Sequence, residues 1–235
     1  FEAGINQFSV YRCESDPRPE RFPVFIRNEF DHVSEAISLI ETQADLDAEL
    51  SKLEKDGIPL IGKIVIEYSG EQISPNIWHR MSTYCVAGEI IPHHMNFGNS
   101  WVVKDGFNKT ELDTHPERDR FLEMERTFVM KSQHVEDLEK AFSIARIEYG
   151  RADFSIKDNR VQVFEINTNP THASESKIYQ NIHPGREEIL RYSEKILQSA
   201  IVELNQADGQ KILLYGTLGA RIKRRLAKAI GLARS

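Results

Sequence analysis

RADFSIKDNRVQVFEINTNPTH, residues Arg151 to His172, is the most informative stretch of this sequence. It contains two short apolar runs separated by the turn-forming residues 157–159, a pattern typical of a β-hairpin. Each run carries an acid, Asp153 in the first and Glu165 in the second. Cross-strand neighbours lie about 4.5 to 5.5 Å apart at Cβ, so a hairpin is expected to bring the two carboxylates side by side.

Two like charges at this separation, flanked by apolar side chains, repel each other and lose hydration, so a cation is expected to offset them. Mg²⁺ takes oxygen ligands, usually one or two carboxylates together with substrate phosphates and water. Asn167 lies two residues after Glu165 and offers a third oxygen on the same strand face. Asp153, Glu165 and Asn167 therefore form a candidate magnesium site.

The same stretch also allows a purely structural interpretation. Asp153 would then form a salt bridge with Arg151 or Arg146, while Asn167 and Asn169 would only make the turn that ends the strand. The spacing alone does not decide between this interpretation and the metal site.

The overall composition is that of an ordinary globular protein. The chain has 235 residues, 40% of them hydrophobic and 28% charged, which suits one large domain or two small ones. The net charge of −6 argues against non-specific nucleic-acid binding, although the tail RIKRRLAKAIGLARS is locally basic. Cys13 and Cys85 lack CxxC spacing and give neither a disulfide framework nor a zinc site. Free thiols favour a reducing compartment, so we expect a cytoplasmic protein.

No apolar run approaches the 18 or so residues of a membrane span, so we expect no membrane partner. The sequence opens at Phe1 without a Met or a leader pattern, and we expect an N-terminal part to be missing. Nothing in the sequence indicates an oligomeric state.

The patterning along the chain predicts alternating groups of strands and helices. Strands are expected at residues 6–12, 22–27, 59–70, 77–88 and 89–98, the last three as an antiparallel meander with turns at Ser69-Gly70 and Ala87-Gly88. Helical spacing predicts helices at 42–57, 117–131, 135–150, 184–205 and 217–232. The helix at 135–150 is expected to end at Gly150. Segregated helices and antiparallel strands indicate an α+β fold rather than a doubly wound parallel sheet.

RADFSI followed by VFEINTNP resembles the end of the ATP-grasp superfamily of carboxylate-amine ligases. Its members carry an acid on one strand and a Glu-x-Asn segment, commonly before Pro, on the next. The resemblance implies that Asp153, Glu165 and Asn167 bind the Mg²⁺ ions that bridge ATP phosphates. It covers about residues 22–205. It also implies antiparallel sheets flanked by helices, with the nucleotide cleft between two subdomains.

The resemblance divides the chain into three parts. Residues 1–68 would be a truncated N-terminal region with the small ATP-grasp subdomain, residues 69–205 the large subdomain, and residues 206–235 a basic C-terminal helix. The N-terminal α/β domain of the superfamily would be missing.

KIVIEYSGE is similar to the hinge strand of that superfamily. Glu67 and the adjacent Tyr68 would receive the adenine, and Glu71 the ribose, because both ligand groups donate hydrogen bonds and need acceptors. FPVFIR is similar to the strand that usually carries a phosphate-binding lysine, and its basic residue here is Arg27. Arg grips phosphate in a bidentate manner. Lys63 is the alternative phosphate cation.

HRMSTYCVAGEIIPHH is similar to the strands over the catalytic cleft of the superfamily. Arg80 would then stabilise the charge on an acyl-phosphate intermediate. His93 and His94 alternate in direction on a strand, so at most one of them would face the cleft and contact substrate.

The resemblance implies an ATP- and Mg²⁺-dependent ligase that joins a small-molecule carboxylate to an amine. Two alternatives stay open: a small-molecule kinase of the same fold, and a catalytically weak or inactive nucleotide-binding module. The basic tail is either a partner-binding helix, for a protein, tRNA or an anionic membrane surface, or a capping helix with a solvated basic face.

Overall fold

The computed structural model describes residues 4–29, 38–104, 106–131, 133–170 and 181–207. The basic C-terminal helix predicted at 217–232 lies outside the described residues. The chain forms two compact units, each of which is described by itself. Unit 1 contains the described residues up to Gln72 together with Ile156–Gln162, and unit 2 contains the described residues of Ile73–Ser155 and those from Val163 onward.

Unit 1 is built on a three-stranded antiparallel sheet in the order β1-β3-β2. Its strands are β1 (Val10–Arg12), β2 (Val24–Asn28) and β3 (Lys63–Glu67), and the short 3-10 helix η1 (Cys13–Ser15) follows β1. One face of the sheet packs on helix α1 (Gln43–Lys55). The core between them consists of buried apolar side chains from the sheet, α1, η1 and the segment before α1: Cys13, Val24, Ile26, Ile40, Leu46, Leu50 and Val65.

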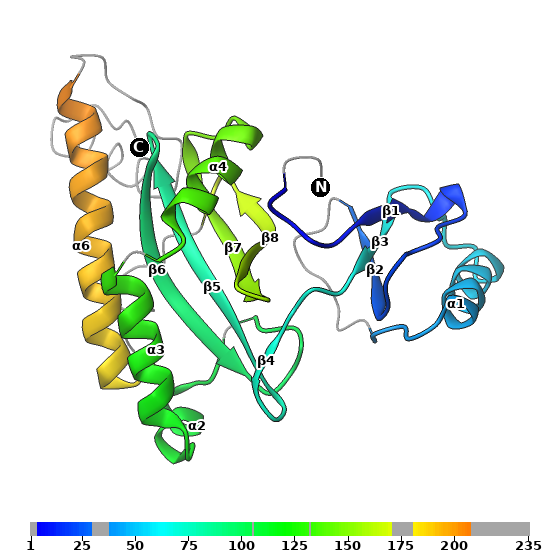
Figure 1. The fold of residues 1–235 in the computed structure, drawn as a ribbon, viewed down its shortest axis with the longest axis horizontal. Helices are drawn as coiled ribbons and strands as arrows, with labels where there is room; N and C mark the ends of the chain where they lie inside the picture. Colours follow the sequence, from blue (N-terminus) through cyan, green and yellow to red (C-terminus); the bar gives the residue numbers. More distant parts are fainter. Residues whose placement is uncertain (1–3, 30–37, 105, 132, 171–180, 208–235) are drawn as a thin grey trace, which may run out of the picture. The chain divides into compact units, whose positions relative to one another are not determined.

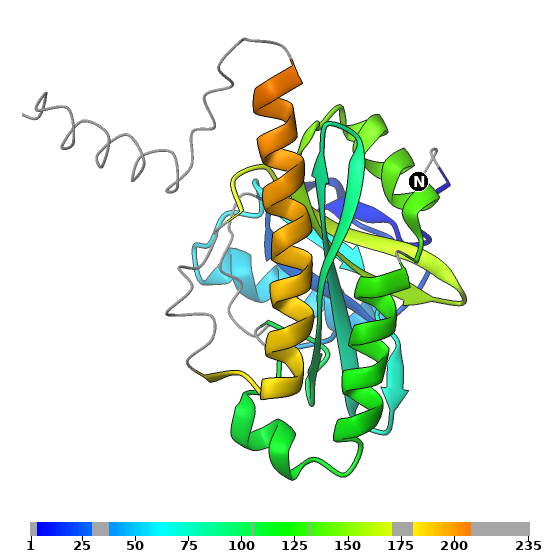
Figure 2. The ribbon, with the colours of Figure 1, turned by 90° about the vertical axis from the view of Figure 1, so that its left-hand side faces the viewer.

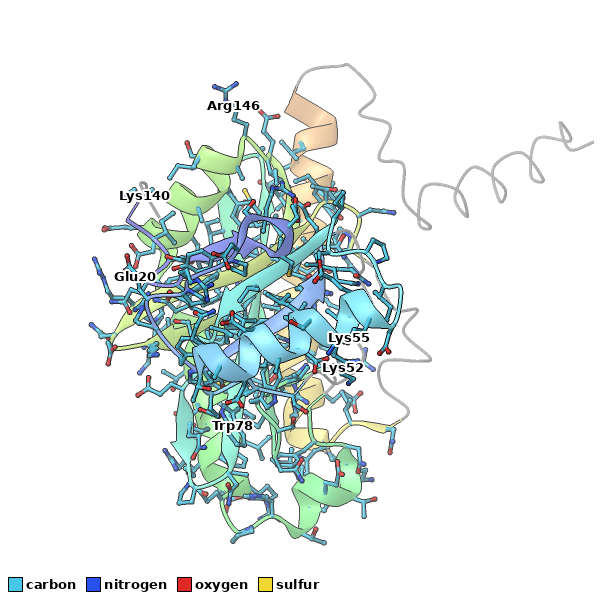
Figure 3. All side chains as sticks on the ribbon, turned by 90° about the vertical axis from the view of Figure 1, so that its right-hand side faces the viewer. Glu20, Lys52, Lys55, Trp78, Lys140 and Arg146 are labelled. Atoms are coloured by element: carbon cyan, nitrogen blue, oxygen red, sulfur yellow. The ribbon has the colours of Figure 1, made fainter. Side chains whose placement is uncertain are left out.

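The ends of α1 follow from local hydrogen bonding and charge. Thr42 is the N-cap, and its side chain accepts a hydrogen bond from the backbone N–H of Asp45. Lys52 and Lys55 lie in the last turn (Figure 3), where positive charge stabilises the negative end of the helix dipole. Leu46 and Leu50, one turn apart, supply the buried face of the helix.

Unit 2 is built on an antiparallel sheet of five strands. The order is β4-β5-β7-β8, and β6 pairs with β5 beside this path. The strands are β4 (Gln72–Ser74), β5 (Ile77–Val86), β6 (Glu89–Gly98), β7 (Tyr149–Lys157) and β8 (Arg160–Asn167). The predicted hairpin turn is present at Asp158 and Asn159, both of which have positive φ.

Four helices lie among the described residues of unit 2. They are α2 (Lys109–Thr114), α3 (Arg118–Lys131), α4 (Val135–Ala145) and the long α6 (Pro184–Ala207). Helices α3 and α6 run along the β5–β6 hairpin (Figures 1 and 2). Stacked rings join α3 to β6, with the centroids of Phe121 and Phe97 4.5 Å apart. The predicted α+β class with antiparallel sheets flanked by helices is confirmed.

Two local predictions were wrong. The predicted meander breaks at Ser69-Gly70, because β3 pairs with β1 and β2 in unit 1, whereas β5 and β6 form a hairpin in unit 2. The helix predicted to end at Gly150 ends at Ala145. Gly150 instead lies in β7, where a Cβ would come within 3.0 Å of the carbonyl oxygen of Asn167. This glycine permits close approach of two strands and does not cap a helix.

Among the described residues, no helix is both long enough and apolar enough to span a membrane.

Candidate active site

Asp153 is the centre of a charged cluster in unit 2. The residue is 3% exposed, and its carboxylate accepts a hydrogen bond from the hydroxyl of Ser82 at 2.5 Å. It forms ion pairs with Nη1 of Arg80 at 3.2 Å and with Nε of Arg151 at 3.5 Å. A buried carboxylate is stable only when it is paired and hydrogen-bonded in this way. Two guanidinium groups around one carboxylate leave an excess of one positive charge among the three groups.

Strand register explains why these residues meet. Ser82 of β5 lies opposite Asp153 of β7 and also opposite His94 of β6, so the three residues form one row across the sheet. Neighbouring residues on a strand point to opposite faces. Phe154 packs its ring against Phe128 of α3, with the centroids 5.9 Å apart, and Asp153 therefore points away from that contact.

The guanidinium of Arg80 is held through both of its terminal nitrogens. One guanidinium nitrogen contacts Asp153, and another donates to the backbone carbonyl of Lys104. The same carbonyl accepts a hydrogen bond from the side-chain amide of Asn96 at 3.3 Å. Asn96 in turn accepts from Arg186 of α6 at 2.9 Å. The orientation of Arg80 therefore depends on a chain of polar contacts that extends to α6.

His93 and His94 lie side by side because of an irregularity in β6. The register between β5 and β6 shifts between Ser82 and Thr83, and His93 is the extra residue. The two Nδ1 atoms are 2.6 Å apart, so one ring must donate to the other. Burial, followed by the positive charge around it, lowers the pKa of His94 well below the ordinary histidine value. The expectation that the two side chains alternate in direction was wrong at this irregularity.

Strand β8, the sheet neighbour of β7, carries the other two predicted metal ligands. Glu165 is exposed, and Asn167 is partly buried. The side-chain oxygen of Asn167 accepts a hydrogen bond from the backbone N–H of Asn169 at 2.9 Å. Two features of the structural interpretation are thus present: the Asp153–Arg151 ion pair and the Asn167–Asn169 turn.

The donor chemistry of Asp153, Glu165 and Asn167 nevertheless fits a magnesium ion. Carboxylate and amide oxygens are hard ligands, and an amide oxygen has two lone pairs, so the turn at Asn167 leaves one of them for a cation. No cluster of three or more His, Cys, Asp or Glu side chains suited to a metal occurs in the described part of the chain. The set holds only two acids, so phosphate oxygens or water would have to supply the remaining ligands.

In unit 1, Glu67 is buried, and its carboxylate is occupied by groups of the same chain. It accepts hydrogen bonds from the backbone of Ser9 at 3.0 Å and from the hydroxyl of Tyr11 at 2.9 Å. The backbone N–H groups of Glu20 and Arg21 and the Arg21 guanidinium also donate to it. Burial alone would raise the pKa of Glu67, but these hydrogen bonds outweigh it, and the net effect is a lowered pKa.

Arg27 and Lys63 lie on opposite faces of the unit 1 sheet. Arg27 pairs with Ile64, whereas Lys63 pairs with Asn28 and donates to its side-chain oxygen at 2.5 Å. Lys63 lies on the same face of the sheet as Ile26, and this face packs on α1. Arg27 therefore lies on the face that α1 does not cover.

The hinge segment, Glu67–Glu71, begins at the last residue of β3 and has a tightly fixed conformation. Tyr68 donates its backbone N–H to the carbonyl of Pro23 at 2.9 Å. A Cβ on Gly70 would lie 2.2 Å from the Tyr68 hydroxyl oxygen, so the aromatic ring folds directly over this glycine. Glu71 is exposed at the end of the segment.

The sequence indicated Arg151 only as a salt-bridge partner of Asp153, and nothing in it indicated Ser82. The Asp153–Arg151 ion pair agrees with the period-2 rule, because Arg151 lies two residues before Asp153 on the same face of β7. Ser82 could not be found in this way, because its contact with Asp153 depends on the pairing of β5 with β7, which are separated by four other elements.

Comparisons with known proteins address the fold alone. No family model and no curated protein matches the chain. Among solved structures, it is similar to an L-amino acid ligase from Bacillus licheniformis, with 13% identity and a TM-score of 0.40 over 71% of this chain and 37% of the other. It is also similar to the D-alanine–D-alanine ligase from Bacillus anthracis complexed with ATP, with 14% identity and a TM-score of 0.42 over 84% and 62%.

A third similar structure is biotin carboxylase from Campylobacter jejuni, with 13% identity and a TM-score of 0.40 over 72% of this chain and 38% of the other. The chain spans less than two thirds of each of these three structures.

Proposed function

We propose that this protein is an ATP- and Mg²⁺-dependent ligase that joins a small-molecule carboxylate to an amine through an acyl phosphate. The observation that carries the proposal is the position of Asp153. This residue of β7 is buried and forms ion pairs with Arg80 and Arg151. The neighbouring strand β8 carries Glu165 and Asn167. An acid strand followed by a Glu-x-Asn strand provides oxygen ligands and cationic groups in one sheet.

Asp153, Glu165 and Asn167 are the residues that would hold magnesium together with the phosphates of ATP. When bound, magnesium would neutralise phosphate charge and orient the terminal phosphate. Asp153 needs its arginine partners for this role, because a carboxylate is stable in a buried position only when it is paired and hydrogen-bonded.

Arg80 and Arg151 would stabilise the reacting anions. In the first step an oxygen of the substrate carboxylate attacks the terminal phosphorus of ATP, and ADP leaves with the bond electrons. In the second step the amine nitrogen attacks the acyl carbon, inorganic phosphate leaves, and the nitrogen releases a proton. Both steps build negative charge on oxygen atoms, which guanidinium groups bind in a bidentate manner. The fixed contacts of Arg80 reduce the reorganisation that this stabilisation costs.

At the nucleotide end we propose that Tyr68 and its neighbouring backbone receive the adenine and that Glu71 receives the ribose. Glu67 would support the hinge rather than touch the base, because its oxygens already accept hydrogen bonds from the chain. Arg27 is favoured over Lys63 as the phosphate cation, because the face of the sheet that carries Lys63 packs on α1.

Amino acids are the first substrates to test, because the L-amino acid ligase and the D-alanine–D-alanine ligase are named for them. Unit 2 offers the Arg80–Arg151 pair as a receptor for a carboxylate. The two buried free thiols favour a reducing compartment, and we propose that the protein acts in the cytoplasm.

The experiment has two stages. Thermal unfolding is first measured with ATP and Mg²⁺, together and separately, for the wild type and for Glu165→Gln. We expect a rise in Tm that needs both ligands and is lost in the variant, whose fold is otherwise unchanged because Glu165 is exposed. No shift with any nucleotide would exclude the ligase proposal for this chain.

In the second stage ADP release is measured with pooled L- and D-amino acids, and hydroxylamine serves as the trapping amine. Hydroxylamine attacks an acyl phosphate to give a hydroxamate and inorganic phosphate. Hydroxamate formation that needs ATP and one amino acid supports the ligase. ADP release with an alcohol and no hydroxamate indicates a kinase instead, and nucleotide binding without turnover of any pool indicates the inactive module.

A further inference from the structure

Strand β8 carries a completely buried glutamine near its start, close to the turn that follows β7. Gln162 is 0% exposed and belongs with unit 1. A primary amide at such a position is unfavourable unless its polar atoms are satisfied, and an apolar side chain would fill the space at lower cost. Its presence therefore indicates that its hydrogen bonds serve a purpose.

Those hydrogen bonds connect Gln162 to two segments distant in sequence. Its carbonyl oxygen accepts from the backbone N–H of Gln7 at 2.8 Å and from the hydroxyl of Ser69 at 3.1 Å. Its amide nitrogen donates to the side chain of Gln7 at 3.5 Å and to the carbonyl of Arg160 at 3.4 Å. One side chain thus uses both ends of its amide, and both its donors and its acceptor are engaged.

Ser69 lies in the middle of the hinge segment Glu67–Glu71, and its side chain is 4% exposed. The residues on either side are also constrained. Glu67 holds the start of the segment through its buried carboxylate, and the Tyr68 ring lies over Gly70. The bond to Gln162 is the contact that fixes the centre.

We infer that Gln162 is a positioning residue that holds the hinge in the conformation that reads an adenine ring. The inference rests on the proposed function, because adenine binding at Tyr68 and its neighbouring backbone is part of that proposal. A base is distinguished by hydrogen-bond donors and acceptors at fixed positions. A hinge whose centre can shift loses this discrimination, because ligand binding must then also order the segment.

The test compares Gln162→Leu with wild type by isothermal titration with ATP and, separately, with GTP, both with Mg²⁺. Gln162→Leu leaves the donors of Gln7 and Ser69 without their acceptor in a buried place. We expect ATP binding to weaken about 10- to 100-fold, and the preference for ATP over GTP to shrink toward one. Ser69→Ala, which removes a single donor, should shift both quantities in the same direction by about 3- to 10-fold.

Ser193→Ala is the matched control. Ser193 is also 0% exposed and donates one hydrogen bond, to the carbonyl of Pro92 at 2.6 Å, but it lies on α6 in unit 2. The Ser193→Ala variant should keep the wild-type preference for ATP over GTP even if its Tm falls. Hydrogen exchange of the nucleotide-free protein gives an independent measure: amides of residues 67–71 should exchange faster in both hinge variants and not in the control.

The outcomes are separable. A wild type that binds neither nucleotide refutes the proposed function. A wild type that binds ATP and GTP equally, or hinge variants that keep the wild-type preference, refute the inference and leave the proposed function standing. If Gln162→Leu does not fold, the result for Ser69→Ala decides.

Discussion

The buried ion pair between Glu125 and Arg186 offers the sharpest test of how unit 2 is held together. Glu125 of α3 is 0% exposed and accepts two hydrogen bonds from the guanidinium of Arg186, at 2.7 and 2.8 Å, and one from the backbone N–H of Met95. Arg186 also donates to the carbonyl of Met95 at 3.0 Å. One pair thus joins α3, α6 and β6.

Replacing Glu125 with leucine should lower the free energy of unfolding by about 3–5 kcal/mol, because it leaves a guanidinium buried without a counterion. The position of Arg186 adds to the effect: it lies in the first turn of α6, where the helix dipole disfavours positive charge. Arg186→Leu should lower the free energy of unfolding by a similar amount, because it leaves the buried carboxylate without a counterion. The double variant should cost much less than the sum of the two, because both buried charges are then gone.

The measurement is urea unfolding of the four proteins that form the double-mutant cycle. The control is the exposed pair Glu187–Arg191 on the same helix, joined at 2.8 Å with 37% and 46% of the side chains exposed. Removing it with Glu187→Ala should cost about 0.3–0.5 kcal/mol. If Glu125→Leu costs no more than this surface variant, the burial argument is wrong.

Three further predictions concern single features. The pKa of Glu67 is lowered in the folded protein, so its ionised carboxylate contributes fully to stability above the ordinary glutamate pKa of 4.5. This contribution is lost as the pH falls through the lower folded-state pKa. Glu67→Gln should therefore flatten the acid side of a Tm-versus-pH curve. Gly106→Ala should lower the free energy of unfolding by about 1–3 kcal/mol in chemical denaturation, because φ is +74° and a Cβ would meet a neighbouring side chain at 2.9 Å. The control is Gly88→Ala, at φ +91°, where a Cβ meets no atom within 4 Å, and its loss of stability should be smaller. His93 and His94 share one hydrogen bond between Nδ1 atoms, so NMR of ¹⁵N-labelled protein should show a coupling between these two nitrogens, and two independent ring signals without it would contradict the contact.

Local patterns predicted the hairpin of β7 and β8 and most helices well, because their signals lie within a few residues. The turn at Asp158-Asn159 and the amphipathic spacing of α6 are examples. The division between sheets was not visible in the same way. β3 pairs with residues of β1 and β2 that lie 35 to 56 positions earlier in the chain. The sequence of one strand does not reveal which other strand it will pair with.

The same limit applies to the candidate site. Asp153 was identified because a charge in an apolar run is unusual within one segment. The burial of Glu67 was not predicted, because its donors come from Ser9, Tyr11, Glu20 and Arg21, which only the fold brings together. The irregularity that pairs His93 with His94 likewise depends on a register between two strands.

The β7–β8 hairpin has a consequence for any attempt to divide the protein. Its tip, Ile156–Gln162, belongs with unit 1, while the strands on either side belong with unit 2. A fragment that stops at Gln72 would therefore lack the acceptor for Ser69 and Gln7 and would leave two polar groups unsatisfied inside it. Unit 1 is complete only with Ile156–Gln162, a segment encoded more than 80 residues downstream of Gln72. The two units are therefore expected to be inherited, expressed and unfolded together.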